Sequence, residues 1–331
     1  MSRRGLDGGE NARRNNEICL ELRRSLERAV KKNLASGILL SGGLDTSVLA
    51  SIASRYVSLK ALTVAFDEAE APDLEYARRV AMHLGLEHNV HLFSRGETYE
   101  AVSEVVKVMR TFDPVEIRND LAIFIALKCA KSVGLSAVMT GDGCDELFAG
   151  YSFLFNYDEK QLRLELEKMW RIMGFSSVPM AKALGVEVKL PFLDPEVKSF
   201  AMNLSPRYLV RGMEGKKWGK WIVRKAFEGI LPNEIVWRVK TPIEYGTGTT
   251  MLRTIFDGEI SYEEFNSKKK RYLERDRVTL RDKEQLFYYE AYRSVVGIPH
   301  AEDLCARTCP MCNSNVRKGV CHCRTCGAYP I

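Results

Sequence analysis

The sequence predicts an α/β fold in which a parallel sheet carries helices on both faces, followed by a mostly helical second half. Three observations predict this class. Short apolar segments alternate with segments of helical periodicity between residues 36 and 155. A glycine-rich turn joins the first apolar segment to the helix that follows it. After residue 155 the periodicity is mostly helical, without an internal repeat or a low-complexity linker.

The elements are expected in a regular order along the chain. Residues 10–33 place apolar side chains among many charges, which predicts an amphipathic helix before the first strand. We therefore expect an N-terminal helix (1–35), an α/β core (36–155), a helical half (156–300) and a small cysteine-rich segment (301–331). The predicted strands are 37–40, 59–66, 88–92 and 137–139, with helices between them that end near residues 84, 109 and 133. Further helices are predicted at 161–173, 179–184, 195–203, 217–228 and 283–296, and structural turns at 185–194 and 237–242.

The composition is that of a globular protein. Of the 331 residues, 46% are hydrophobic and 28% are charged, and no apolar run is long enough to cross a membrane. The first residues are polar and do not form a signal-peptide core, so we expect a cytoplasmic protein. The formal net charge of +6 permits a nucleic-acid partner without requiring one. Six of the nine cysteines lie between Cys305 and Cys326, which favours a bound metal in a reducing compartment.

The turn at residues 41–47 is suited to a phosphate ligand. Gly42 and Gly43 let the backbone take positive φ and approach a ligand closely, and the amides at the helix start favour negative charge. Asp45 would repel phosphate unless a divalent cation lay between them, so we expect Mg²⁺ there. The Gly-Lys-Ser/Thr ending of the Walker type is absent. We interpret the turn as an ATP pyrophosphate site with hydroxyl groups from Ser41, Thr46 and Ser47; the alternative is an ordinary glycine turn.

A second polar loop follows the strand predicted at 137–139. It contains Thr140, Gly141 and three acids. Because the carboxyl ends of parallel strands meet at one edge of a sheet, this loop is expected to face the turn at 41–47. Asp145 would then lie opposite Asp45 as a second Mg²⁺ ligand, the alternative being an acidic surface loop.

Four segments in colinear order carry a resemblance to a known family. Residues 41–47 resemble the PP-loop of ATP pyrophosphatases, and residues 140–151 resemble a Gly-Glu-Gly-x-Asp-Glu-hydrophobic-Phe-Gly-Gly-Tyr signature. Residues 185–194 resemble a Gly-x-Glu-x-Arg-x-Pro-Phe-Leu-Asp block, and residues 215–246 resemble a Gly-Lys helix followed by a Trp-Arg-x-Lys segment. Over roughly residues 15–297 the chain resembles the synthetase domain of asparagine synthetase and of relatives such as β-lactam synthetase. The resemblance implies the adenine nucleotide alpha-hydrolase-like fold.

The resemblance also implies a reaction. ATP would lie with its adenine near Leu40 and Val64 and its phosphates on residues 41–47, with Thr140 and Gly141 beside them. A carboxylate, by default aspartate, would attack the α-phosphate and release pyrophosphate, and ammonia or another amine would then displace AMP. The residues carried over are Lys240 at the α-phosphate, Arg118 on the substrate side, Tyr151 and Glu187 in amine deprotonation, and Asp142 in place of a signature glutamate.

Departures from the family pattern bear on this activity. Asp142 is shorter than the signature glutamate, which withdraws the carboxylate by roughly 1.5 Å from the place where it would position the nucleophile. Lys189 replaces an arginine and loses its bidentate geometry, and Ala149 replaces a glycine. Ser2 stands where the family's glutaminase domain has its N-terminal cysteine nucleophile, and we expect that domain to be missing. The expected amine source is therefore free ammonia, another amine or a separate glutaminase subunit.

The cysteine-rich segment predicts a zinc ribbon. Two Cys-x-x-Cys pairs, Cys309 with Cys312 and Cys323 with Cys326, have the spacing of a structural Zn²⁺ site. Cys321 is the expected substitute if one of the four is not a ligand, Cys305 is a further one, and a disulfide cluster is the alternative to a metal. The segment is basic through Arg307, Arg317, Lys318 and Arg324, which suits RNA, although a docking module or a plain cap fits equally well.

Three functions remain open from the sequence. The first is an asparagine synthetase-like, ATP-dependent and AMP-forming carbon–nitrogen ligase with ATP, Mg²⁺ and Zn²⁺ as cofactors. The second is a tRNA-modifying adenylating enzyme that uses the ribbon to bind RNA. The third is a partner-binding protein with a decayed site, against which the presence of Asp45, Asp145 and Lys240 argues.

Overall fold

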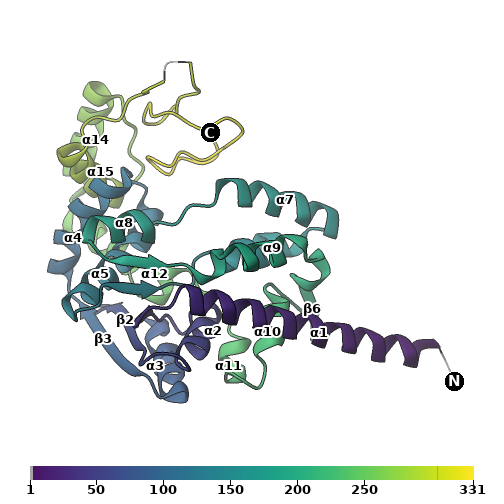
Figure 1. Cartoon of the computed structure of the whole chain (residues 1–331). Coiled ribbons are helices and arrows are strands. Elements are labelled where there is room, and N and C mark those ends of the chain that lie inside the picture. The colour runs from purple at the N-terminus through teal and green to yellow at the C-terminus, as the bar shows by residue number, and fades with distance from the viewer. Residues whose placement is uncertain (1–2, 304) are drawn as a thin grey trace.

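The computed structural model describes residues 3–303 and 305–331, with side chains from residue 12 onward, so Ser2 lies outside the described residues. Its centre is a five-stranded sheet in the order β3-β2-β1-β4-β5, in which every neighbouring pair is parallel (Figure 1). The predicted fold class, a parallel sheet with helices on both faces and a helical second half, is therefore confirmed. The strands are β1 (Gly37–Leu39), β2 (Lys60–Phe66), β3 (Glu87–Phe93), β4 (Ala137–Met139) and β5 (Glu187–Lys189).

Strand β5 corrects the expectation that residues 185–194 form only a turn. Glu187 donates its backbone N–H to Ser136 O at 2.8 Å, and Lys189 O accepts from the backbone N–H of Thr140 at 3.1 Å. The segment is too short to show a periodic pattern in the sequence, and its pairing with β4 makes it a strand. The fifth strand places the segment after β5 next to the loop that follows β4.

The side chains of β2 separate two apolar cores. Leu62, Val64 and Phe66 pack in one core, while Ala61 packs in the other, as the two-residue period of a strand requires. The first core contains α4 (Arg95–Met109), α5 (Pro114–Ser132), α8 (Ser177–Leu184), α13 (Met251–Glu259), α14 (Tyr262–Asp276) and α15 (Lys283–Val295). The second contains α1 (Arg3–Lys32), α2 (Leu44–Ala53), α3 (Pro72–Leu84), α6 (Cys144–Phe148), α7 (Glu159–Ile172), α9 (Pro195–Asn203), α10 (Trp221–Phe227) and α11 (Asn233–Val236).

Helix α1 confirms the predicted amphipathic helix. Leu22, Leu26, Ala29 and Val30 lie on one face and are fully buried against the second core. The N-terminal part of the helix extends away from the rest of the chain (Figure 1). In the part of the chain that the structure describes, no helix is long and apolar enough to span a membrane.

The helix predicted at 217–228 begins later than expected. A two-stranded antiparallel hairpin, β6 (Arg211–Met213) and β7 (Lys216–Trp218), comes first, and α10 starts only at Trp221. Gly215 has φ +77° and Lys220 has φ +53°, and left-handed backbone at both positions interrupts helical geometry. Helix α12 (Ile243–Gly246) follows α11 and lies beside α5. Lys220 is thereby placed at the junction between the hairpin and α10, pointing into the molecule.

Candidate active site

The glycine turn between β1 and α2 has the shape that the sequence predicts. Gly42 has φ +65°, and a Cβ atom there would lie 2.3 Å from the backbone of Tyr76 and of Ala77, so only glycine fits. Ser47 is buried and donates its hydroxyl to Gly43 O at 2.7 Å, which closes the turn internally. Ser41 and Thr46 present their side chains to a cavity beside the turn.

This cavity of about 430 Å³ lies at the carboxyl ends of the strands, which is where ligands bind in parallel sheets. It brings together segments that are distant in the sequence, including the turn after β1, the loop after β4, one face of α5 and residues 174–177 and 238–247. The predicted residues that line it are Leu40, Ser41, Gly43, Asp45, Thr46, Val64, Thr140, Gly141, Asp142, Asp145, Tyr151 and Lys240.

A buried lysine that the sequence analysis did not single out lies at the centre of the site. Lys220 Nζ is 2.7 and 2.6 Å from the two carboxylate oxygens of Asp45 and 2.7 Å from Asp145 Oδ1. Burial lowers the pKa of Lys220, but the two carboxylates outweigh burial and its pKa is raised overall. The site thus holds its ammonium group charged. The only signal in the sequence was a glycine–lysine pair ahead of an apolar helix.

Asp45 and Asp145 converge on one point, as predicted for two ligands of a divalent cation. Burial opposes the charged form of Asp145, but Lys220 and Lys240 lower its pKa to about 2. Lys240 Nζ lies 2.6 Å from Asp145 Oδ2. Both carboxylates line the cavity, and their oxygens are of the donor type that Mg²⁺ prefers, although each oxygen lies within 2.7 Å of a lysine Nζ.

Arg238 fixes the segment that carries Lys240. Its Nη1 donates to Ser41 O at 3.1 Å, its Nη2 donates to Asp73 Oδ1 at 2.5 Å, and its guanidinium lies 3.9 Å from the centre of the Tyr76 ring. These contacts tie residues 238–240 to the glycine turn. Lys240 itself keeps a side chain that is 35% exposed and lies 4.9 Å from the centre of the Tyr151 ring.

Two acids of the loop after β4 accept hydrogen bonds from hydroxyl groups. Thr140 Oγ1 and Ser177 Oγ both donate to Asp142 Oδ2, at 2.9 and 2.5 Å, and burial raises the pKa of Asp142. Tyr151 donates its hydroxyl to Glu146 Oε1 at 2.5 Å, and burial raises the pKa of both groups. Ser177 reaches the carboxylate of Asp142 from the start of α8.

Two of the predicted catalytic residues do not line the cavity. Arg118 is almost fully buried between Glu244 and Glu284, with Nε and Nη1 at 2.5 and 2.7 Å from their carboxylates. Glu187 is exposed on β5 and accepts from Lys189 Nζ at 2.6 Å. The roles assigned to Arg118 and Glu187 therefore stay predictions that these positions do not support.

The four predicted cysteine ligands of the ribbon come together. Cys309, Cys312, Cys323 and Cys326 are buried, and their sulfur atoms all lie within 4.8 Å of one another. The two Sγ–Sγ distances of 3.7 and 3.6 Å exceed a disulfide bond, and four thiolates at about 2.3 Å from a tetrahedral metal are spaced in this way. Cys305 and Cys321 are exposed and lie outside the cluster.

The cysteine cluster packs into the first core. Its four cysteines share this core with Phe112. Phe112 donates its backbone N–H to Thr325 O at 2.7 Å, and Gln285 Nε2 donates to Cys326 O at 2.7 Å. His322 Nε2 lies 3.3 Å from Asp113 Oδ2, and Asp113 caps the start of α5. The ribbon therefore supports the helix that forms one wall of the cavity.

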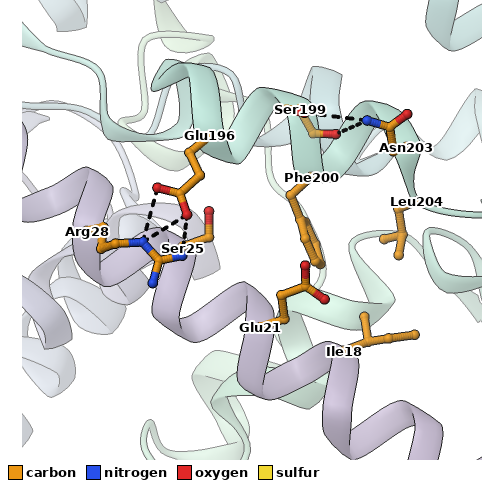
Figure 2. A pocket seen from close by; sticks show the side chains of 9 residues that line it. All are labelled: Ile18, Glu21, Ser25, Arg28, Glu196, Ser199, Phe200, Asn203 and Leu204. Carbon is orange, nitrogen blue, oxygen red and sulfur yellow. Dashed lines mark hydrogen bonds and ion pairs between the residues drawn. The ribbon is translucent and has the colours of Figure 1, made fainter.

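A second hollow, of about 500 Å³, lies far from these residues between α1 and α9 (Figure 2). Arg28 Nε donates to Glu196 Oε1 at 2.8 Å across it, and Asn203 Nδ2 donates to Ser199 O at 2.8 Å. Arg28, Glu196 and Asn203 are thus paired within the two helices that form it. We interpret this hollow as the groove along which α1 packs against α9.

Comparison with known proteins agrees with this geometry. The asparagine synthase family model matches residues 20–174 and 175–301. The chain is 29% identical over 308 residues to asparagine synthetase B (glutamine-hydrolyzing) of Escherichia coli (strain K12), covering 86% of this chain and 55% of that protein. It is 31% identical over 313 residues to the probable asparagine synthetase (glutamine-hydrolyzing) of Dictyostelium discoideum, covering 84% and 56%. The chain thus spans about half the length of these curated relatives.

Among solved structures, that of NMN synthetase from Francisella tularensis aligns with 85% of this chain and 92% of its own, at 16% identity and a TM-score of 0.37. This similarity is too low to support an assignment. The family match covers most of the sequence and includes the glycine turn, the loop after β4 and the segment of Lys220 and Lys240. The chain belongs to the asparagine synthase family.

Proposed function

We propose that this protein is an ATP-dependent ligase that activates a carboxylate as an acyl-adenylate and then forms an amide with release of AMP. The observation that carries the proposal is the convergence of Asp45, Asp145, Lys220 and Lys240 beside a glycine turn at the carboxyl ends of parallel strands. Such an arrangement offers backbone amides, fixed cations and two metal-binding carboxylates to one polyphosphate. Aspartate is the default acceptor by resemblance.

In the first step, a carboxylate oxygen of the acceptor would bond to the α-phosphorus of ATP. The bond from this phosphorus to its bridging oxygen would break, and pyrophosphate would leave. Lys240 would stabilise the charge on the α-phosphate. Asp145 orients the ammonium group of Lys240 through a contact of 2.6 Å, and the lysine side chain is accessible from the cavity. Asp45 and Asp145 would hold Mg²⁺, which when bound neutralises charge on the phosphates.

In the second step, an amine nitrogen would bond to the acyl carbon, and AMP would leave with the electron pair of the broken carbon–oxygen bond. The amine then has a proton to lose. Tyr151 and Glu146, joined by a hydrogen bond of 2.5 Å, form a hydroxyl–carboxylate pair on the cavity wall that suits this task. Tyr151 thus keeps its predicted role, while Glu146 takes the place that was predicted for Glu187.

The proposal is tested by measuring AMP and pyrophosphate formed from ATP with MgCl₂, ammonium chloride and a panel of carboxylates that includes aspartate. Mass spectrometry identifies the amide product. Asp45→Asn is expected to abolish product, whereas Asp67→Asn, an exposed aspartate outside the cavity, should behave like the wild type. ADP and phosphate in place of AMP and pyrophosphate would contradict the mechanism.

We further propose that the four-cysteine cluster binds Zn²⁺ and that this metal is structural. Four buried thiolates leave no open coordination position, so the metal would stabilise the fold without touching substrate. Inductively coupled plasma mass spectrometry should find one zinc per chain, and Cys312→Ser should lose it. Retention of stoichiometric zinc by the variant would contradict the assignment.

A second candidate function is adenylation of an RNA-linked substrate. It is favoured by the exposure of Arg307, Arg317, Lys318 and Arg324 on the ribbon. Binding of tRNA that weakens steeply with salt and is lost on charge reversal of these four residues would support this candidate. Amide formation on a free small carboxylate at full rate without RNA would exclude it.

A further inference from the structure

The basic residues of the cavity all lie on its phosphate side. They are Lys220, Arg224, Arg238 and Lys240, and they come from one segment of the chain. Lys220 contacts Asp45 and Asp145, Lys240 contacts Asp145, and Arg238 contacts Ser41 O and Asp73. Arg224 donates to the backbone oxygens of Gly219 and Arg238 at 2.9 and 3.0 Å. Lys220, Arg238 and Lys240 are therefore engaged around the turn where ATP would place its phosphates, and Arg224 holds the backbone of the segment that carries Arg238.

Two acids of the loop after β4, Asp142 and Glu146, also line the cavity, and their hydrogen-bond partners are hydroxyl groups. Thr140 and Ser177 both donate to one oxygen of Asp142, and Tyr151 donates to Glu146. Among the cavity-lining residues that the structure describes, no lysine, arginine or histidine pairs with either acid. The Ser177 hydroxyl at the start of α8 already donates its hydrogen to Asp142, so it is not free to donate to a ligand.

A third acid, Asp120, lies next to the residues that line the cavity. Asp120 of α5 is only 4% exposed, its Oδ2 has no hydrogen-bond partner, and it contacts Ser176, which lines the cavity. Burial, the largest cause, raises the pKa of Asp120 to about 7. The arginine predicted for the substrate side, Arg118, is held by Glu244 and Glu284. Lys240 lies near the Tyr151–Glu146 pair, whereas no lysine or arginine of the described residues pairs with Asp142 or Asp120.

We infer that the acceptor of this ligase is a carboxylate that also carries an ammonium group and lacks a second carboxylate. The inference rests on the proposed function and defines its substrate class. An ammonium group would give Asp142 the charged partner that the protein does not supply. A second carboxylate at the same end would face Asp142 and Asp120 without a cation, and buried like charges strongly disfavour binding. By this reasoning aspartate is a poorer acceptor than its analogue without the α-carboxylate.

Two matched sets of probes separate the two charges. β-Alanine is aspartate without its α-carboxylate, and succinate is aspartate without its amine; γ-aminobutyrate and glutarate stand in the same relation to glutamate. ATP–pyrophosphate exchange with the full chain and MgCl₂ should give a kcat/KM for β-alanine or γ-aminobutyrate at least about tenfold above both partners in its set.

A variant of Asp142 tests whether this acid determines the preference for an acceptor that carries an ammonium group. Asp142→Asn should raise the KM for the favoured amino acid by about tenfold while leaving the KM for the matched dicarboxylate without an amine unchanged or lower. A merely structural role would raise both KM values together. Glu87→Gln, which removes an exposed acid on β3 outside the cavity, is the control and should change neither KM.

The outcomes distinguish this inference from the function on which it rests. Exchange with aspartate or succinate that equals or exceeds exchange with β-alanine, and likewise in the glutamate set, would overturn the inference and leave the ligase intact. Absence of exchange with all six probes, in a chain that binds Mg·ATP by calorimetry, would also overturn it. A chain that does not bind Mg·ATP would overturn the proposed function itself.

Discussion

Lys220→Met removes the ammonium group that joins Asp45 and Asp145 while keeping a side chain of similar length. The lysine side chain is 5% exposed, and the carboxylates are 19% and 15% exposed. Loss of one partner from a buried ion pair leaves uncompensated charge and costs about 3–5 kcal/mol. This is a large share of the roughly 5–15 kcal/mol that stabilises a typical domain. We therefore expect a severe loss of stability at neutral pH.

The pH dependence of stability provides a second readout of the same contact. The pKa of Asp145 falls from its ordinary 3.8 to about 2 on folding, which corresponds to about 2 kcal/mol. Because the folded pKa is the lower one, this contribution is complete above pH 3.8 and is lost as the pH falls through about 2. Without Lys220 the pKa of Asp145 should rise toward or above its ordinary 3.8, so the variant should lose less stability than the wild type as the pH falls below 3.8.

Urea unfolding followed by fluorescence of the four tryptophans measures both effects. Lys225→Met is the matched control, because Lys225 lies in the same helix, pairs with Glu228 and has a 35% exposed side chain. Its loss should cost less than about 1 kcal/mol. Equal stability of Lys220→Met and the control would refute the reasoning.

Three further changes test other parts of the structure. Ala149 has φ +55°, so Ala149→Gly should raise the free energy of unfolding by about 1 kcal/mol, and an unchanged or lower melting temperature would contradict the strain. Gly42→Ala would place a Cβ atom 2.3 Å from the backbone of α3, so this variant should not bind Mg·ATP in a calorimetric titration in which the wild type does. Removal of zinc by a chelator should lower the melting temperature of the chain even though the metal lies outside the cavity, and a ribbon that is only an appended tail would leave it unchanged.

Much of the site was accessible from the sequence because its geometry is local. The conformation of the glycine turn is determined by a few residues that are adjacent in the sequence, and Asp45 belongs to the same short segment. Asp145 could be placed opposite Asp45 because parallel strands bring their carboxyl ends to one edge. The cysteine cluster could be predicted equally well, because the spacing of the two Cys-x-x-Cys pairs is visible in the sequence.

The parts that escaped prediction depend on tertiary contacts. Lys220 is 175 residues from Asp45, and in the sequence it resembles any lysine at the start of a helix. Its left-handed backbone, which aims the side chain inward, has no signal in its residue type. Arg118 was assigned from the resemblance to the family, but the direction of its side chain depends on Glu244 and Glu284, which lie more than a hundred residues later. Long-range ion pairs of this kind form through tertiary packing, and no periodic pattern in the sequence marks them.

The docking of the ribbon has a consequence for how the chain is made. Residues 305–331 are synthesised after every element that they contact, including the start of α5 and α15. Until these residues emerge from the ribosome and fold, Phe112 and the tyrosines around it lack part of their apolar covering. A truncated or zinc-starved chain would thus display an aromatic surface of the kind that chaperones and proteases recognise. With the proposed zinc bound there, the ribbon would link the accumulation of the folded chain to the supply of metal.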